Sequence, residues 1–254
     1  MAGTDSTQVS AIGGPVVVLI NAQLGENIGT AVRAMRNCGL EELRLVSPRK
    51  GWLNEKTIAA TAGADTTLER ANVYPEIAEA ISDLHHIFAT TARPRDMEKP
   101  VLSPHEAAER MCEAYGRGEK VGILFGPERA GLTNDDVALS EAIIEVPLNP
   151  TFASLNLAQA VLLVGYEWFQ TALSVNRCSP SSSRGDTRPA TQAELRGLFE
   201  HLEGELDACS FLRVKEKRPA MIRNIRNIFT RASLSDREVS TLRGIVTGLT
   251  HRKG

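Results

Sequence analysis

LFGPERAGLTNDDVALSEAIIEVPLNPTFASLNLAQAVLLVGYE, residues 124–167, is the most informative segment of this sequence. The apolar runs at 121–125 and 142–147 have the length and composition of buried strands, and Gly126-Pro127 is a strong turn signal between them. Thr133 with Asp136 three residues later is typical of a helix start. After Asn156, apolar residues recur at helical spacing. The stretch therefore predicts strand, glycine loop, strand and helix in succession.

The loops between these elements favour a binding site, although each loop alone has a simpler interpretation. Gly126 and Gly131 would let a ligand approach the main chain closely, yet glycines at this spacing also suit an ordinary strand-to-helix turn. No Gly-Lys-Ser or Gly-Lys-Thr follows, which argues against a phosphate-binding P-loop. Ser154 or Asn156 could simply cap the helix that begins there. Only the combination points to a common ligand.

Several segments together resemble the SPOUT RNA methyltransferases. FGPE-x-x-GL at 125–132, I-x-V-P-L at 144–148 and SLNLAQAV at 154–161 look like motifs two and three of that family. Residues 27–39 match its motif one, N-x-G-x-x-x-R-x-x-x-x-x-G. Three motifs in order over roughly the first 170 residues are far more specific than a lone glycine pattern.

The resemblance implies an α/β fold whose mostly parallel sheet ends in a deep trefoil knot, an exception to the rule that chains do not thread loops. It also implies that S-adenosylmethionine is held bent in the knot, and that a homodimer packs the knotted regions together. No metal is implied. Carried onto this sequence, the cofactor-binding residues would be Thr90, Thr91, Ala92, Leu124, Gly126, Glu128, Ile144, Val146, Pro147, Ser154, Leu155 and Asn156.

The reaction implied is methyl transfer to a 2′-hydroxyl of RNA. Placing the reacting atoms in line can lower the barrier by roughly 7–11 kcal/mol, and a base or a phosphate must take the hydroxyl proton. By position Arg33 is the family's catalytic arginine, and because a guanidinium stays protonated we expect it to bind the target phosphate and stabilise the alkoxide. The resemblance adds Asn27 and Ser154 to the catalytic set and Arg93 as a phosphate clamp. A surface charge for Arg33 and a helix cap for Asn27 are the simpler interpretations.

Charge is distributed unevenly along the 254 residues. The formal net charge is −2, but residues 191–254 carry +4 and residues 1–190 carry −6. Between residues 213 and 231, seven cations face one acid, Glu216. Charge runs are usually solvated faces, yet this one suits phosphate contacts. The predicted RNA-binding residues are Arg93, Arg213, Lys215, Lys217, Arg218, Arg223 and Arg226.

The pattern of apolar residues divides the chain into an α/β part and a helical part. Five apolar runs of strand length, at 15–20, 42–47, 86–91, 120–125 and 142–147, alternate with helical stretches and predict a parallel sheet covered on both faces. A Ser- and Pro-rich segment at 178–191 indicates a linker between a methyltransferase domain, 1–177, and a helical extension, 192–254. Three apolar stripes in that extension predict three helices, with Pro219 in the first turn of the second and Ser235 with Glu238 as a capping box for the third. Arg223 and Arg226 should point away from the packed face of the second helix.

The sequence as a whole predicts a dimeric, cytoplasmic enzyme. Four cysteines lack the C-x-x-C spacing of a zinc site, and no run near the N-terminus is apolar enough for a signal or an anchor. The helical tail resembles that of the TrmJ branch, which implies tRNA 2′-O-methylation of the cytidine or uridine at anticodon-loop position 32. The alternatives are another tRNA or ribosomal-RNA site, or a non-catalytic RNA-binding module that kept the fold.

Overall fold

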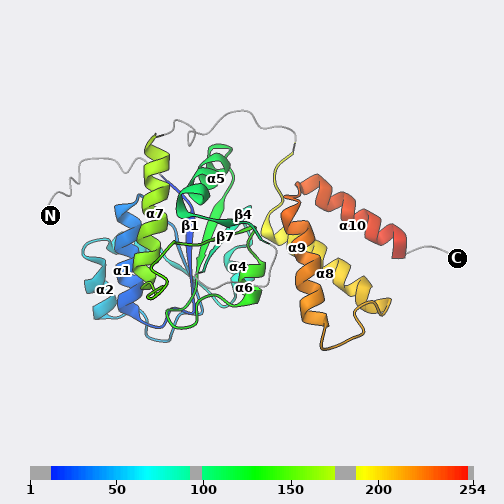
Figure 1. Ribbon diagram of the computed structural model, residues 1–254, viewed down its shortest axis with the longest axis horizontal. Coiled ribbons are helices and arrows are strands. Elements are labelled where there is room, and N and C mark those ends of the chain that lie inside the picture. The colour runs from blue at the N-terminus through cyan, green and yellow to red at the C-terminus, as the bar shows by residue number, and fades with distance from the viewer. Residues whose placement is uncertain (1–12, 92–98, 175–186, 251–254) are drawn as a thin grey trace.

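The computed structural model describes residues 13–91, 99–174 and 187–250. A sheet with helices on both faces is followed by three further helices (Figure 1). The strands are β1 (Val16–Ile20), β2 (Leu43–Val46), β3 (Asn72–Tyr74), β4 (His86–Thr90), β5 (Val101–Leu102), β6 (Val121–Phe125) and β7 (Ala142–Ile144). The helices around them are α1 (Gly25–Asn37), α2 (Glu55–Thr61), α3 (Asp65–Glu69), α4 (Ile77–Ala80), α5 (Pro104–Gly116), α6 (Asn134–Ala138) and α7 (Leu157–Ser174).

The strands lie in the order β3-β2-β1-β6-β4-β7-β5, and every pairing between them is parallel. This confirms the predicted parallel α/β sheet, and five of its strands are the five predicted runs. The other two, β3 and β5, have three and two residues and were not predicted. Segments this short carry no detectable periodicity. Because the strands are parallel, their carboxyl ends meet along one edge, which is where ligands bind in open α/β sheets.

Both faces of the sheet are buried, and β1 shows why its sequence is apolar throughout. Val17 and Leu19 pack into one core with α1, α5 and α7, where Trp168 is fully buried. Val16, Val18 and Ile20 face the opposite way and pack into a second core beside α4 and α6. A strand buried on both sides reads as a continuous apolar run rather than an alternating one.

The C-terminal helices α8 (Gln192–Ala208), α9 (Arg218–Arg231) and α10 (Asp236–Thr250) confirm the three predicted helices. Their small core consists of Ala190, Leu195, Leu198 and Val239. Pro219 occupies the first turn of α9, and Ser235 with Glu238 forms the predicted capping box. The start of α8 is attached to the sheet domain, because the amides of Gln192 and Ala193 donate to the carbonyls of Leu84 and Ser82 at 2.9 and 3.0 Å.

The predicted linker at 178–191 lies largely outside the described residues, as do Ala92 and Arg93. Within it, Thr191 forms a capping box with Glu194 at the start of α8.

Candidate active site

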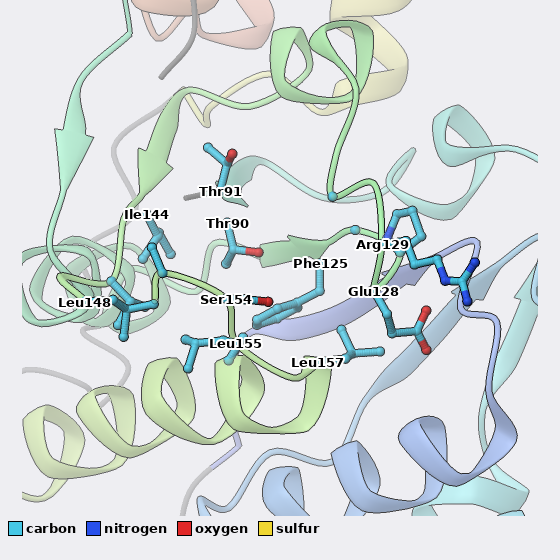
Figure 2. Close-up of a pocket in the computed structure, with 16 residues that line it drawn as sticks. Thr90, Thr91, Phe125, Glu128, Arg129, Ile144, Leu148, Ser154, Leu155 and Leu157 are labelled. Atoms are coloured by element: carbon cyan, nitrogen blue, oxygen red, sulfur yellow. The ribbon is translucent and has the colours of Figure 1, made fainter. Parts of the chain in front are cut away.

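A cavity of about 300 Å³ opens at the carboxyl edge of the sheet, beside the start of α7. Its walls come from the ends of β4, β6 and β7 and from the loops that follow β6 and β7. In Figure 2, Ile144 and Leu148 lie at one end and Glu128 and Arg129 at the other. The lining residues are Thr90, Thr91, Phe125, Gly126, Pro127, Glu128, Arg129, Gly131, Ile144, Val146, Leu148, Ala153, Ser154, Leu155, Leu157 and Ala160.

The loop after β6 folds back tightly on itself. A Cβ atom at Gly126 would lie 2.3 Å from the backbone nitrogen of Leu132, and the amide of Gly131 donates to the carbonyl of Pro127 at 2.8 Å. Gly131 has φ +65°, a conformation that favours glycine. The two glycines are therefore required by the loop itself, and not only by the approach of a ligand. Thr133 and Asp136 end the loop with the predicted capping box at α6.

A hydrogen-bonded chain connects this loop to the helices that carry motifs one and three. Asn27, in the first turn of α1, donates through Nδ2 to Oε1 of Glu128 at 2.8 Å. Asn156 donates through Nδ2 to Oδ1 of Asn27 at 3.1 Å. The Oδ1 atom of Asn156 in turn accepts from the amide of Ala158 at 2.8 Å and caps α7. Of the two candidate caps, Ser154 and Asn156, it is therefore Asn156 that caps α7, and its Nδ2 atom also joins the hydrogen-bonded chain to Glu128.

The carboxylate of Glu128 is held in its charged form. It accepts hydrogen bonds from the backbone amides of Gln23 and Leu24 as well as from Asn27. Burial by itself raises the pKa of Glu128, but these hydrogen bonds outweigh it and leave the pKa below its usual range. A negative charge is therefore fixed at one end of the cavity.

The structure places most of the predicted cofactor residues around this cavity. Thr90, Thr91, Gly126, Glu128, Ile144, Val146, Ser154 and Leu155 line it. Leu124 contributes its carbonyl, which accepts from the Thr90 hydroxyl at 2.9 Å. Pro147 and Asn156 are outside the lining, although Asn156 reaches it through Asn27 and Glu128. Among the residues that sequence reasoning missed are Phe125, Leu157 and Ala160, whose apolar side chains carry no signal that separates a cavity wall from a core.

The predicted catalytic residues differ in their surroundings. Ser154 is exposed at the mouth of the cavity, and in Figure 2 its hydroxyl and that of Thr90 lie between the two ends. Arg33 is exposed on α1 and outside the cavity lining. Within the described part of the chain its guanidinium makes no hydrogen bond or ion pair, so it is available to a substrate.

The sequence expectation about two arginines of α9 is wrong. Arg223 and Arg226 were expected to point away from what α9 packs against, but Arg223 pairs with Asp135 of α6 at 2.9 Å and Arg226 with Glu203 of α8 at 2.7 Å. Arg226 also lies 5.7 Å from the centre of the Phe199 ring, as a cation–π contact. Helical periodicity shows that these arginines lie outside the apolar stripe of α9. It cannot show that acidic residues of α6 and α8 lie beside them.

Fold and site together define an α/β enzyme with a ligand cavity at the carboxyl edge of a parallel sheet. The model of the SpoU rRNA Methylase family matches residues 14–166, and that of the tRNA methyltransferase TrmJ C-terminal domain matches residues 193–253. The chain belongs to the SpoU family and is a methyltransferase. Methyltransferases of this family use S-adenosylmethionine.

Relatives cover nearly the whole chain. It is 35% identical to a Pseudomonas aeruginosa protein named tRNA (cytidine/uridine/adenosine-2′-O-)-methyltransferase TrmJ, over 91% of each chain. It is 33% identical to an uncharacterized tRNA/rRNA methyltransferase of Haemophilus influenzae, over 93% of this chain and 94% of the relative. The crystal structure of TrmJ from Z. mobilis superimposes with a TM-score of 0.82 at 46% identity, covering 92% of this chain and 98% of the other.

The described residues contain neither a membrane-spanning helix nor a cluster of metal ligands. None of their helices is long and apolar enough to cross a bilayer. No group of three or more His, Cys, Asp or Glu side chains among them is arranged to hold a metal ion.

Proposed function

We propose that this chain is an S-adenosylmethionine-dependent tRNA 2′-O-methyltransferase acting on the cytidine or uridine at position 32 of the anticodon loop. Similarity over almost the full length to proteins named TrmJ supports the substrate class. The observation that carries the proposal is the convergence of the motif loops on one cavity, with Asn27, Glu128 and Asn156 hydrogen-bonded in series beside it.

The cavity suits S-adenosylmethionine in size and in chemistry. Its volume of about 300 Å³ is that of a small-molecule site. Apolar walls at Phe125, Ile144 and Leu155 fit a purine ring, and the Glu128 carboxylate fits a cationic group. When bound, the cofactor supplies an electrophilic methyl group. We further propose that this region forms the trefoil knot, since β7 lies between β4 and β5 although both precede it in the chain.

Arg33 and Ser154 are the residues proposed to act on the RNA. The exposed guanidinium of Arg33 would bind the phosphate of the target nucleotide and stabilise the negative charge that develops on the ribose oxygen. Ser154, exposed at the cavity, would hydrogen-bond the substrate. Asn27 would act as a positioning residue, because it holds Glu128 and Asn156 in place rather than facing the cavity.

The remaining assignments follow the same family pattern. The methyltransferase domain would comprise residues 1–177 and the helical extension residues 192–254, joined by a linker. The exposed apolar side chains of Leu162, Leu163 and Tyr166 on α7 support a homodimer that packs this helix against its mate. A tRNA substrate implies that the enzyme is located in the cytoplasm.

The test is methyl transfer from labelled S-adenosylmethionine to total tRNA, followed by mapping of the methylated nucleotide. We expect the label on the ribose of position 32. Arg33→Ala should abolish transfer while cofactor affinity stays near normal. Arg36→Ala is the matched control, because Arg36 is exposed on the same helix but pairs with Glu41 at 3.0 Å.

Two results would count against the proposal. Normal turnover by Arg33→Ala would refute the role of that arginine. In a strain lacking the protein, loss of a ribosomal methyl group with intact tRNA would instead favour the ribosomal alternative.

A further inference from the structure

Six of the seven cations between residues 213 and 231 fall into two structural groups. Three of them are ion-paired: Arg218 with Asp207 at 2.6 Å, and Arg223 and Arg226 as described above. By contrast Arg213, Lys215 and Lys217 are exposed and make no ion pair with any described residue. All three lie in the connection between α8 and α9, residues 210–217, which we call the basic loop.

The basic loop has a defined conformation. Ser210 has φ +62°, its amide donates to the carbonyl of Asp207, and the amide of Phe211 donates to that of Leu206 at 2.9 Å. This pattern is a Schellman motif at the end of α8. Leu212 is buried, and the Arg218–Asp207 pair closes the two ends of the loop. Its cations are therefore displayed on a folded support.

Apolar side chains are exposed among these cations. Phe211 is 59% exposed and Val214 is 45% exposed, so the basic loop presents an aromatic ring and an aliphatic side chain to solvent beside its cations. Exposed aromatic rings next to free cations are the combination with which proteins hold unpaired RNA, because every base offers a face for stacking and the cations bind the flanking phosphates. In Figure 1 the basic loop and the start of α7 both lie on the lower side of the molecule.

We propose that the basic loop is a binding site for unpaired RNA, in which Phe211 stacks on a base while Arg213, Lys215 and Lys217 contact phosphates. The inference rests on the proposed tRNA substrate and narrows its docking surface. The three ion-paired arginines of α9, Arg218, Arg223 and Arg226, then serve chiefly to hold that helix against α8 and α6. Duplex RNA would gain from the cations but not from Phe211, because its bases are already stacked.

The test measures the Kd of the full chain for two probes, a tRNA anticodon stem-loop and a blunt RNA duplex of equal length. Phe211→Ala should weaken binding of the stem-loop by about 5- to 100-fold, which is the usual effect of removing one stacking side chain, and should leave the duplex unchanged. Phe211→Trp should restore it. Leu249→Ala is the matched control, because Leu249 is 69% exposed on α10.

Salt dependence separates the cations from the ring. Replacing Arg213, Lys215 and Lys217 together by Ala should flatten the slope of log K against log salt by about 2, whereas Phe211→Ala should leave the slope unchanged. Arg196→Ala, an exposed cation of α8 paired with Glu200, serves as the charge control.

The proposal is overturned if Phe211→Ala binds the stem-loop as tightly as Leu249→Ala, if it weakens duplex binding equally, or if the triple variant keeps the wild-type slope. Binding needs no methyl transfer. A wild-type chain that binds through Phe211 but methylates no tRNA would therefore refute the proposed function and leave this site standing.

Discussion

The substitution Gly29→Ala tests whether α1, the helix that carries Arg33, is held in position by close packing against α2. A Cβ atom at Gly29 would lie 2.2 Å from the carbonyl oxygen of Thr57 and 2.8 Å from Cβ of Ala60, both on α2. The first of these is a backbone atom, which no side-chain rotation can move. Gly29→Ala must therefore push the helices apart by roughly 1 Å to restore normal contact.

Two opposing effects decide the stability of Gly29→Ala. Alanine raises helix propensity by about 1 kcal/mol relative to glycine. Overpacking costs about 1–3 kcal/mol, and we expect the upper end because the obstacle is backbone. The net loss should be about 1–2 kcal/mol, or roughly 2–8 °C in Tm for a chain of this size.

Gly204 is the matched control, because it is also a helical glycine but has no atom within 4 Å of its added Cβ. Gly204→Ala should gain up to about 1 kcal/mol, so the two substitutions should shift the melting curve in opposite directions. Far-UV circular dichroism on heating measures both. If Gly29→Ala raised Tm as much as Gly204→Ala does, close packing of α1 on α2 would be refuted as the reason for that glycine.

Three further outcomes are expected. Asn27→Ala should weaken S-adenosylmethionine binding by about tenfold or more in calorimetry, since it removes a hydrogen bond to charged Glu128 and one to the cap of α7; unchanged affinity would contradict the positioning role. Burial lowers the pKa of His86, but hydrogen bonds to two carboxylates outweigh it and raise the pKa to about 9. The stabilising effect of protonated His86 is thus fully present below about pH 6.5 and lost as pH rises toward 9. The free energy of unfolding in urea should therefore be higher for wild type than for His86→Asn at low pH, and this difference should shrink between about pH 6.5 and 9. Iodoacetamide should alkylate exposed Cys209 and spare Cys38, because burial raises the Cys38 pKa to about 11; peptide masses showing equal labelling would contradict this.

The sequence was informative wherever structure depends on neighbours along the chain. Runs of five or six apolar residues identified the long strands, and capping pairs such as Thr133 with Asp136 located helix starts, because both signals are local. Strands β3 and β5 depend instead on pairing with β2 and β7, which no local pattern records.

The loops of the candidate site could be located from the sequence, but the hydrogen bonds between them could not. Glycine and proline marked the turns at 126–131 and 147–150. The bonds that join them, from Asn27 to Glu128 and from Asn156 to Asn27, span 101 and 129 residues of sequence. His86 is a similar case, because its partners Glu119 and Glu141 lie 33 and 55 residues away. The sequence alone shows which polar residues are present, whereas the fold determines which of them form hydrogen bonds with each other.

One side chain, that of Asn156, both caps α7 and belongs to the hydrogen-bonded chain beside the candidate site. Its Oδ1 atom satisfies a backbone donor at the start of α7, which the helix would need whatever the protein did. That bond fixes the rotation of the side chain, so Nδ2 is left facing Asn27, and Asn27 in turn holds Glu128 in the loop after β6. Three segments distant in sequence are thereby held by one helix cap. A substitution that preserves the cap but removes Nδ2, Asn156→Asp, should therefore keep α7 intact while placing a second carboxylate beside Asn27, and its effect should appear in cofactor binding before it appears in Tm.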